Sequence, residues 1–146
     1  MSHSRQYATF YLGQEYLGVD VLRVQEVLRP QTMTPVPRAP DYIAGLISLR
    51  GQIVTAIDLR RRLGMEERVP PIAPMSVILN TQDGPISLLV DDIGDVLQVP
   101  AHSFEPPPEN LAISIARYIQ GVHKLPGTLL TVLDADLITG HTGGEP

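Results

Sequence analysis

The 146-residue sequence contains no cysteine and no tryptophan, and only 5% of its residues are aromatic. Without cysteine the chain has no thiolate nucleophile, no cysteine-type zinc site and no disulfide framework, which suits a reducing compartment. It also lacks an apolar N-terminal run of signal-peptide length and any stretch of about 18 consecutive apolar residues. We therefore expect a soluble, cytoplasmic protein whose core forms without a metal or disulfide.

Catalytic and cofactor motifs are also missing. The histidines have no i, i+4 pair that could bind zinc and no triad motif around them, and they are scattered over positions 3, 102, 123 and 141. Neither GxGxxG nor GxxxxGK occurs, so nothing in the sequence supports nucleotide binding. The sequence therefore shows no catalytic motif, and we predict no cofactor and no metal.

Asp91, Asp92 and Asp95 form the densest acidic cluster. Mg²⁺ can be bound through one or two such carboxylates. Because aspartate also favours strand ends and turns, we interpret the three as acids that face water.

Charge is distributed unevenly along the chain. Residues 1–68 carry nine arginines against seven acids, whereas residues 69–146 carry two cations against nine acids, which gives a net charge of −5. An acidic chain without a basic stripe argues against nucleic acid as a partner. The one basic run, Arg60 to Arg62, is interpreted as stabilising the C-terminal end of a short helix, with a phosphate site as the alternative.

One segment of the sequence occurs twice. Residues 42–64 and 118–140 share 8 of 23 residues at a constant offset of 76 positions. A single duplication in a chain of this length predicts two similar small lobes, because a solenoid needs at least about three repeats. Asp58 and Asp134 end a strand at the point where a helix can start.

Short strands separated by turn residues dominate the rest of the pattern, which is typical of small closed barrels. The expected hairpins have Gly, Asp-Gly or Pro-Gly at their turns, and they span residues 6–21, 45–57, 75–91 and 118–134. Residues 93–99 are expected as a strand or short helix, and residues 22–28 as an amphipathic helix capped by Asp20. Residues 65–74 look like a linker between the lobes.

Three long stretches resemble the core signatures of the CheW-type coupling proteins of bacterial chemotaxis. They are GVDVLRVQEVLRP (18–30), TPVPRAPDYIAGLISLRGQIVTAIDLRRRLG (34–64) and VDDIGDVLQV (90–99). The resemblance spans nearly the whole chain and includes no kinase or receiver segment. The chain therefore resembles the free-standing form of this domain.

The resemblance implies an all-β fold of two SH3-like five-stranded barrels with short helices, internally duplicated, in a single domain over residues 1–146. The second lobe is expected mainly from about residue 75 onward, with interleaving possible, and residues 141–146 are expected to be a frayed tail. It also implies a non-enzymatic adaptor that couples methyl-accepting chemoreceptors to a CheA-type histidine kinase. Such an adaptor is recruited to receptor arrays at the inner membrane without entering the bilayer.

The family's receptor contact is a groove between the barrels. The matching positions in this sequence are Val24, Glu26, Val27, Arg50, Ile93 and Val96. The apolar members suit the apolar face of a receptor helix, although core packing explains the valines equally well. Arg50 is expected either to contact the receptor directly or to hold Glu26, and the sequence leaves both alternatives open.

The kinase-binding surface is expected on the barrel that carries the crossing loop and the central hairpin. Its candidate residues are Met33, Val36, Gln52 and Ile53, since an exposed apolar edge calls for a dedicated partner. Gly45, Gly51 and Asp58 are expected to be structural. In particular, aspartate at Gly45 would bury an unpaired charge in a tight strand crossing.

Two alternatives remain open at this point. A coupler of this kind can serve a pilus or surface-sensing pathway instead of motility. A two-barrel protein can also be a platform for a ligand or an oligonucleotide, which binding to single-stranded nucleic acid would reveal.

Overall fold

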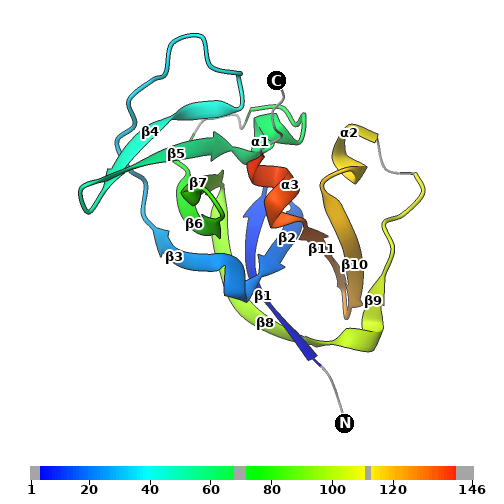
Figure 1. Cartoon of the computed structure of the whole chain (residues 1–146). Coiled ribbons are helices and arrows are strands. Elements are labelled where there is room, and N and C mark those ends of the chain that lie inside the picture. The colour runs from blue at the N-terminus through cyan, green and yellow to red at the C-terminus, as the bar shows by residue number, and fades with distance from the viewer. Residues whose placement is uncertain (1–3, 68–71, 111–112, 141–146) are drawn as a thin grey trace.

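The computed structural model describes residues 4–67, 72–110 and 113–140, the last range without the side chains of residues 113 and 114. The secondary structure of this part is mostly β (Figure 1). The strands are β1 (Ser4–Leu12), β2 (Glu15–Asp20), β3 (Val24–Leu28), β4 (Ile43–Leu49), β5 (Gln52–Asp58), β6 (Met75–Thr81), β7 (Gly84–Val90), β8 (Asp92–Pro100), β9 (Phe104–Glu105), β10 (Ile119–Leu125) and β11 (Thr128–Leu133). The helical turns are η1 (Val21–Arg23), α1 (Leu59–Arg62), η2 (Ala101–Ser103), α2 (Ile113–Ala116) and α3 (Ala135–Thr139).

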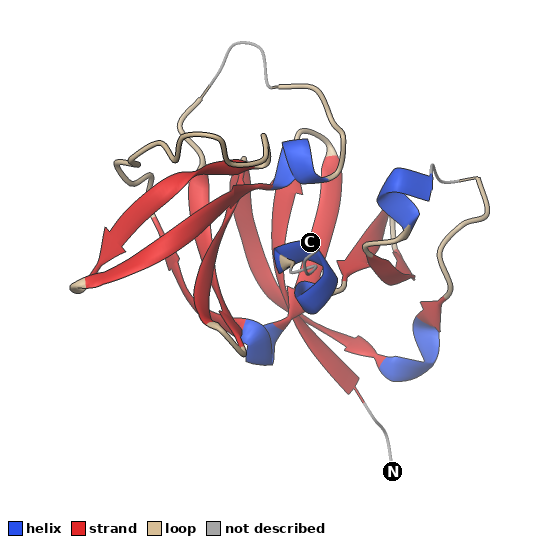
Figure 2. Ribbon diagram, turned by 45° about the horizontal axis from the view of Figure 1, so that its top comes forward, coloured by secondary structure: helices blue, strands red, loops and turns tan. Residues whose placement is uncertain are grey.

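The strands form two sheets, which we call lobe 1 and lobe 2. Lobe 1 has five strands in the order β3-β6-β7-β5-β4, and lobe 2 has six in the order β8-β1-β2-β11-β10-β9. The two curved sheets lie side by side, with α1 and α3 adjacent between them (Figures 1 and 2). This arrangement confirms the expected all-β fold of two small β lobes with short helices, although lobe 2 has a sixth strand, the two-residue β9, beyond the five expected.

The lobes are interleaved in the sequence: lobe 2 takes four of its six strands from beyond residue 75, but residues 75–90 belong to lobe 1. The hairpin of β6 and β7 belongs to lobe 1, where β7 pairs in parallel with β5. The hairpin of β1 and β2 belongs to lobe 2, where β2 pairs in parallel with β11. Each half of the chain therefore gives its first hairpin to the other half's sheet.

The chain passes between the lobes at two short junctions. It goes from lobe 2 to lobe 1 through η1 and returns at Asp91, between β7 and β8. Residues 65–74, expected as a linker between lobes, instead join two parts of lobe 1; of these, residues 68–71 lie outside the described residues. The expected frayed tail, residues 141–146, also lies outside them.

The internal repeat is kept in atomic detail. The backbone N–H of Asp58 donates to the carbonyl of Tyr42, and that of Asp134 to the carbonyl of Tyr118, each at 2.8 Å. The strand pairing shifts register just before Gly45 in lobe 1 and just before the equivalent Gly121 in lobe 2. Both copies end in a helix whose N-cap is the conserved aspartate of the pair, as the sequence predicts.

The expected amphipathic helix over residues 22–28 is wrong. Asp20 does cap a turn, because its side chain accepts a hydrogen bond of 2.9 Å from the backbone N–H of Leu22, but that turn ends at Arg23. Residues Val24–Leu28 then form β3 with burial that alternates along the strand, and they pair with β6. Ladder pairing with β6 outweighs the helical spacing of the valines, which are good strand formers.

The largest core cluster lies between the lobes and includes buried residues of both, such as Phe10 and Leu12 of lobe 2 with Ile57 and Leu88 of lobe 1. Each lobe also has a small interior cluster of its own. Because most buried apolar surface is shared, the two lobes form one cooperative unit.

Arginines of α1 tie the lobes together. Arg60 makes a buried ion pair with Asp91 (Nη2–Oδ2 2.5 Å), and Asp91 also accepts a hydrogen bond of 2.6 Å from the backbone N–H of Gly13. Arg62 donates to the carbonyl of Ile138 at 3.1 Å and stacks on the ring of Tyr42. The short helix was predicted correctly, but these two arginines bind across to other elements instead of capping their own helix.

Among the described residues, no helix has both the length and the apolar character needed to cross a bilayer.

Candidate protein-binding surfaces

Glu26 and Arg50, two of the predicted receptor-binding residues, form a bidentate ion pair. Arg50 Nη2 lies 2.6 Å from Glu26 Oε1, and Nη1 donates to Oε2. The hydrogen bond from the guanidinium lowers the pKa of the Glu26 carboxyl. The structure therefore shows that Arg50 holds Glu26 on the surface of lobe 1. At the same time the Arg50 side chain remains 68% exposed and accessible to a partner.

The backbone of Arg50 adopts a conformation that is unfavourable for a side chain. Its φ is 51°, and Gly51 follows with a φ of 81°, so the hairpin of β4 and β5 turns through two left-handed residues. Asn-Gly is the preferred sequence for such a turn. Strained residues are concentrated at functional sites. Arginine at this position aims a guanidinium at Glu26 of β3, which an asparagine is too short to reach.

The four apolar candidates for the receptor groove divide evenly between core and surface. Val24 of β3 and Ile93 of β8 are partly buried and pack against the cluster between the lobes. Val27 is 41% exposed and Val96 is 59% exposed. β3 and β8 occupy equivalent places at the edges of their sheets. Each lobe therefore offers one edge strand with a buried and an exposed apolar side chain.

The predicted kinase-binding residues lie on the crossing segment, residues 29–42, and on the central hairpin of lobe 1. Met33 packs against the lobe 1 interior, and Val36 is half-buried. Ile53 is 65% exposed and Gln52 beside it is also exposed. An isoleucine this exposed in a strand is a candidate contact for another protein.

Gly45 and Gly51 are required for different reasons. A Cβ on Gly45 would lie 2.7 Å from the carbonyl oxygen of Thr34, which is fixed by its pairing with Leu46. A Cβ on Gly51 would meet nothing within 4 Å, so only its left-handed backbone favours glycine. Asp58 caps α1 by accepting a hydrogen bond of 3.3 Å from the backbone N–H of Arg61.

The interpretation of the acidic cluster as water-facing is wrong for Asp91. Its side chain is 8% exposed and pairs with Arg60 at the junction between the lobes. In the described ranges, no group of three or more acidic, histidine or cysteine side chains is placed to hold a metal.

A hydrogen-bonded histidine in lobe 2 is a feature that the sequence reasoning missed. His123 is fully buried, with Nε2 2.9 Å from the hydroxyl of Tyr7 and Nδ1 2.7 Å from that of Ser103. Burial, together with the nearby charge of Arg5, lowers the pKa of His123. The repeat contained the signal, because His123 stands where the first copy has the apolar Ile47.

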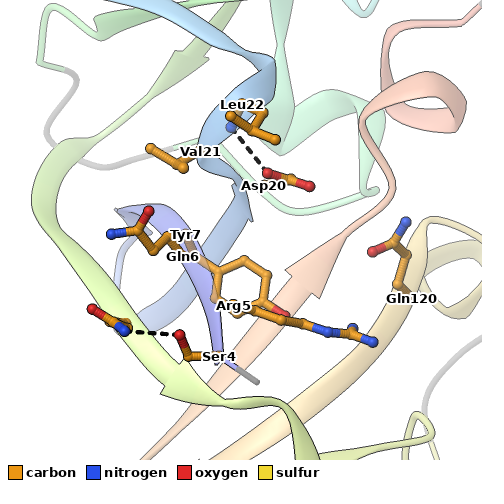
Figure 3. Close-up of a pocket in the computed structure, with 9 residues that line it drawn as sticks. Ser4, Arg5, Gln6, Tyr7, Asp20, Val21, Leu22 and Gln120 are labelled. Atoms are coloured by element: carbon orange, nitrogen blue, oxygen red, sulfur yellow. Dashed lines mark hydrogen bonds between the residues drawn. The ribbon is translucent and has the colours of Figure 1, made fainter. Parts of the chain in front are cut away.

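An open polar cleft of about 490 Å³ lies on lobe 2 (Figure 3). None of the predicted site residues lines it. Arg5 and Asp20 give it opposite charges, and a hydrogen bond of 2.7 Å from Gln98 to Ser4 is part of its wall. Because these two charges balance, the lining favours neither an anion nor a cation.

Comparison with known proteins assigns a family to this arrangement. The CheW-like domain matches residues 6–142. The chain is 33% identical over 133 residues to a chemotaxis protein CheW of Treponema pallidum, an alignment that covers 88% of this chain and 78% of that protein. It is 30% identical over 132 residues to a chemotaxis protein CheW of Klebsiella aerogenes, covering 90% and 80% of the two chains.

The fold agrees with a solved structure as well. The scaffolding protein TtCheW from Thermoanaerobacter tengcongensis superposes with a TM-score of 0.86 at 27% identity, over 100% of this chain and 98% of that one. Sequence and fold thus agree over nearly the whole length. The chain belongs to the CheW-like domain family.

Proposed function

We propose that this chain is a non-enzymatic adaptor that couples methyl-accepting chemoreceptors to a CheA-type histidine kinase. The match of the CheW-like domain to residues 6–142 carries this proposal. The described residues are consistent with it, because they present exposed apolar and charged side chains on two parts of the surface. In this role the chain is recruited to receptor arrays at the membrane through its partners.

We assign the receptor to the edge strands of the two lobes and to the pair of Glu26 and Arg50. Val27 and Val96 are the exposed apolar side chains on these strands, which suits the apolar face of a helix. Val24 and Ile93 support them from the core beneath. The ion pair fixes the orientation of the bound helix.

We assign the kinase regulatory domain to the crossing segment and the central hairpin of lobe 1. Ile53 and Gln52 are the exposed contacts, and Met33 and Val36 form the half-buried base. This surface is distinct in residue content from the receptor surface, so one chain can engage both partners. Small signalling interfaces of this kind are modest in affinity, and many linked copies strengthen them.

The test is reconstitution with receptors and kinase from the same organism. The wild-type chain is expected to bring the kinase to receptor-containing membranes and to place its autophosphorylation under receptor control. A chain that binds neither partner in this assay contradicts the proposal. Binding to single-stranded nucleic acid instead supports the alternative of a small-barrel platform.

Charge reversal at Arg50 separates the two surfaces. Arg50→Glu is expected to lose receptor coupling while the fold and kinase binding stay intact, and equal loss of both partners contradicts separate surfaces. The double variant Glu26→Arg, Arg50→Glu restores the ion pair with reversed polarity. Rescue of receptor binding shows that Arg50 acts by holding Glu26, whereas no rescue shows direct contact with the receptor.

A further inference from the structure

A turn in the crossing segment holds an arginine in a strained conformation. The backbone N–H of Ala39 donates to the carbonyl of Val36 at 3.3 Å, which closes a four-residue turn with Pro37 and Arg38 in its centre. Arg38 has a φ of 66°. With proline in the second position, a positive φ in the third is the type II pattern, which calls for glycine or asparagine there.

Arg38 shares this strain with one other residue. In the described chain, Arg38 and Arg50 are the non-glycine residues with positive φ. At Arg50 the strained backbone directs the guanidinium toward Glu26, and the ion pair between the two side chains accounts for this conformation. Arg38 is exposed, and its guanidinium contacts no acid, carbonyl or aromatic ring among the residues that the structure describes. The strained conformation of Arg38 therefore supports no side-chain contact within the described part of the chain.

Lack of a partner is unusual among the arginines of this protein. Within the described ranges, the other arginines apart from Arg29 make ion pairs, hydrogen bonds or ring contacts. Arg29 and Arg38 both lie on the crossing segment. An unpaired cation on an interaction surface favours a partner with a carboxylate at the matching position.

The segment that carries Arg38 is held rigidly. Thr34 exchanges two backbone hydrogen bonds of 2.8 Å with Leu46 of β4, and the N–H of Ile43 donates to the carbonyl of Pro40 at 3.0 Å. Prolines at positions 35, 37 and 40 restrict the backbone between these anchors. The loop arches away from β4 (Figure 1), so the side chain is presented to solvent from a fixed base at low entropic cost of binding.

We propose that Arg38 is a specificity residue that recognises a carboxylate on the regulatory domain of the kinase. The inference rests on the proposed function, which assigns the neighbouring Met33 and Val36 to the kinase surface. Apolar contacts from these residues and Ile53 supply the general attachment, and Arg38 selects a kinase with an acidic side chain opposite the turn. A regulatory domain with a neutral or basic residue there binds more weakly.

The test measures the stability and the kinase affinity of the same variants. Arg38→Asn removes the charge and keeps a side chain that tolerates the left-handed backbone. We expect its melting temperature to equal or exceed that of the wild type, while its affinity for the kinase regulatory domain falls about threefold to tenfold. Arg38→Lys is expected to retain most of the affinity, and Arg38→Glu to lose more than the asparagine variant.

Arg29→Asn is the matched control, because it removes the same charge from the same segment at a position without positive φ. If Arg29→Asn weakens kinase binding as much as Arg38→Asn, a general charge effect replaces the proposal. The salt dependence gives a second readout: affinity of the wild type should fall more steeply with added NaCl than that of Arg38→Asn. Equal salt dependence contradicts a charged contact.

Failure of this inference can be distinguished from failure of the proposed function. If the wild type binds the regulatory domain, Ile53→Asp loses that binding and the Arg38 variants keep it, only the role of Arg38 is wrong. If the wild type does not bind the regulatory domain, the proposed function itself fails. If the Arg38 variants weaken receptor binding and leave kinase binding unchanged, the carboxylate belongs to the receptor and the inference is overturned.

Discussion

The interiors of the two lobes differ although their backbones repeat. In lobe 1 the interior cluster is Ile47, Val54 and Ile78, which are all apolar. In lobe 2 the counterpart of Ile47 is His123, buried among aromatic rings and bonded to two hydroxyls. The same backbone fold can therefore have either an apolar or a hydrogen-bonded interior, provided that each buried polar group has a hydrogen-bond partner.

The hydrogen bonds in lobe 2 form a chain with a direction. Ser103 donates to the carbonyl of Pro100 at 2.9 Å, so its oxygen accepts from Nδ1–H of His123. Nε2 then accepts from the hydroxyl of Tyr7. This assignment pairs every donor and requires a neutral imidazole. This series of hydrogen bonds connects η2, β10 and β1, which are distant in sequence.

In lobe 1, two buried serine hydroxyls are not hydrogen-bonded. The hydroxyls of Ser76 and Ser87 are buried without a hydrogen-bond partner. Ser76 occupies the place in β6 that Tyr7 occupies in β1, counted from the hairpin turns. The Tyr7 hydroxyl in lobe 2 has a hydrogen-bond partner and the Ser76 hydroxyl in lobe 1 has none. Mutations at equivalent positions of the two lobes can therefore be compared directly.

The largest effects are expected at the glycines of the register shifts. Gly121→Asp places a Cβ against the carbonyl of Glu105 and the ring of Phe104, and Gly45→Asp places one against the carbonyl of Thr34. Overpacking and a buried unpaired charge should together cost about 4 kcal/mol or more in either lobe. Urea denaturation should show both variants unfolded or strongly destabilised, in one transition because the core is shared.

The control for this pair is Gly51→Ala. Its Cβ meets no atom within 4 Å, so only the left-handed backbone opposes it, with an expected cost of about 1–2 kcal/mol. If Gly45→Asp retains the stability of the wild type, the crossing of the strand by Thr34 is not the constraint that the structure indicates.

The second largest effect is expected when the centres of the lobes are made alike. Ile47→His places an imidazole in the apolar interior of lobe 1, where burial without partners should cost about 2–4 kcal/mol of unfolding free energy. Chemical denaturation measures the loss. A neutral effect would mean that the Ser76 hydroxyl turns to bond the new ring, and the contrast between the interiors would then be one of residue choice alone.

The pH dependence of stability tests His123 directly. The folded chain holds its pKa below the unfolded value of about 6.5, so above that pH both states are neutral and the full stability is present. As pH falls below about 6.5 the unfolded state takes up a proton first, and stability decreases by up to about 1.4 kcal/mol per pH unit until the folded histidine also titrates.

The double variant His123→Ile, Tyr7→Phe gives lobe 2 an apolar centre and is the reference for this measurement. Denaturation at several pH values between 7.5 and 5 should show a smaller loss in the double variant than in the wild type. Identical pH profiles would mean that the imidazole is protonated or solvated in the folded chain, contrary to the hydrogen-bond chain described above.

The smallest effects are expected at the serines. Ser76→Ala and Ser87→Ala each remove a buried hydroxyl that has no partner, and each should stabilise the chain by about 1 kcal/mol. Ser103→Ala removes a bonded hydroxyl and should destabilise by about 1 kcal/mol. Thermal unfolding of the three variants compares them. If Ser76→Ala and Ser103→Ala change the stability in the same direction, the bonded and unbonded hydroxyls do not distinguish the two interiors.

Most local elements of this protein were predictable from the sequence. The hairpins formed where turn residues separate β-branched runs, because turn geometry acts over a few residues. The caps by Asp20, Asp58 and Asp134 formed for the same reason, since each bonds an N–H two or three residues away. The repeat predicted two lobes, and the family resemblance identified the residues of the ion pair at Arg50.

The predictions that failed concern pairing over long distances. Val24–Leu28 became a strand because β6, about 50 residues later, offers an edge. Asp91 became buried because Arg60 reaches it from another element. The strain at Arg38 is likewise invisible in the sequence, because its φ depends on how the crossing segment is anchored to β4.

The sequence by itself determined the four hairpins, the turns, the caps, the duplication and the family, because these depend on local conformational preferences and on a recognisable order of residues. The tertiary structure alone decided which hairpin joins which lobe, since parallel pairing of β5 with β7 and of β2 with β11 is chosen by burial of the shared core. It also decided which charges pair across the lobes.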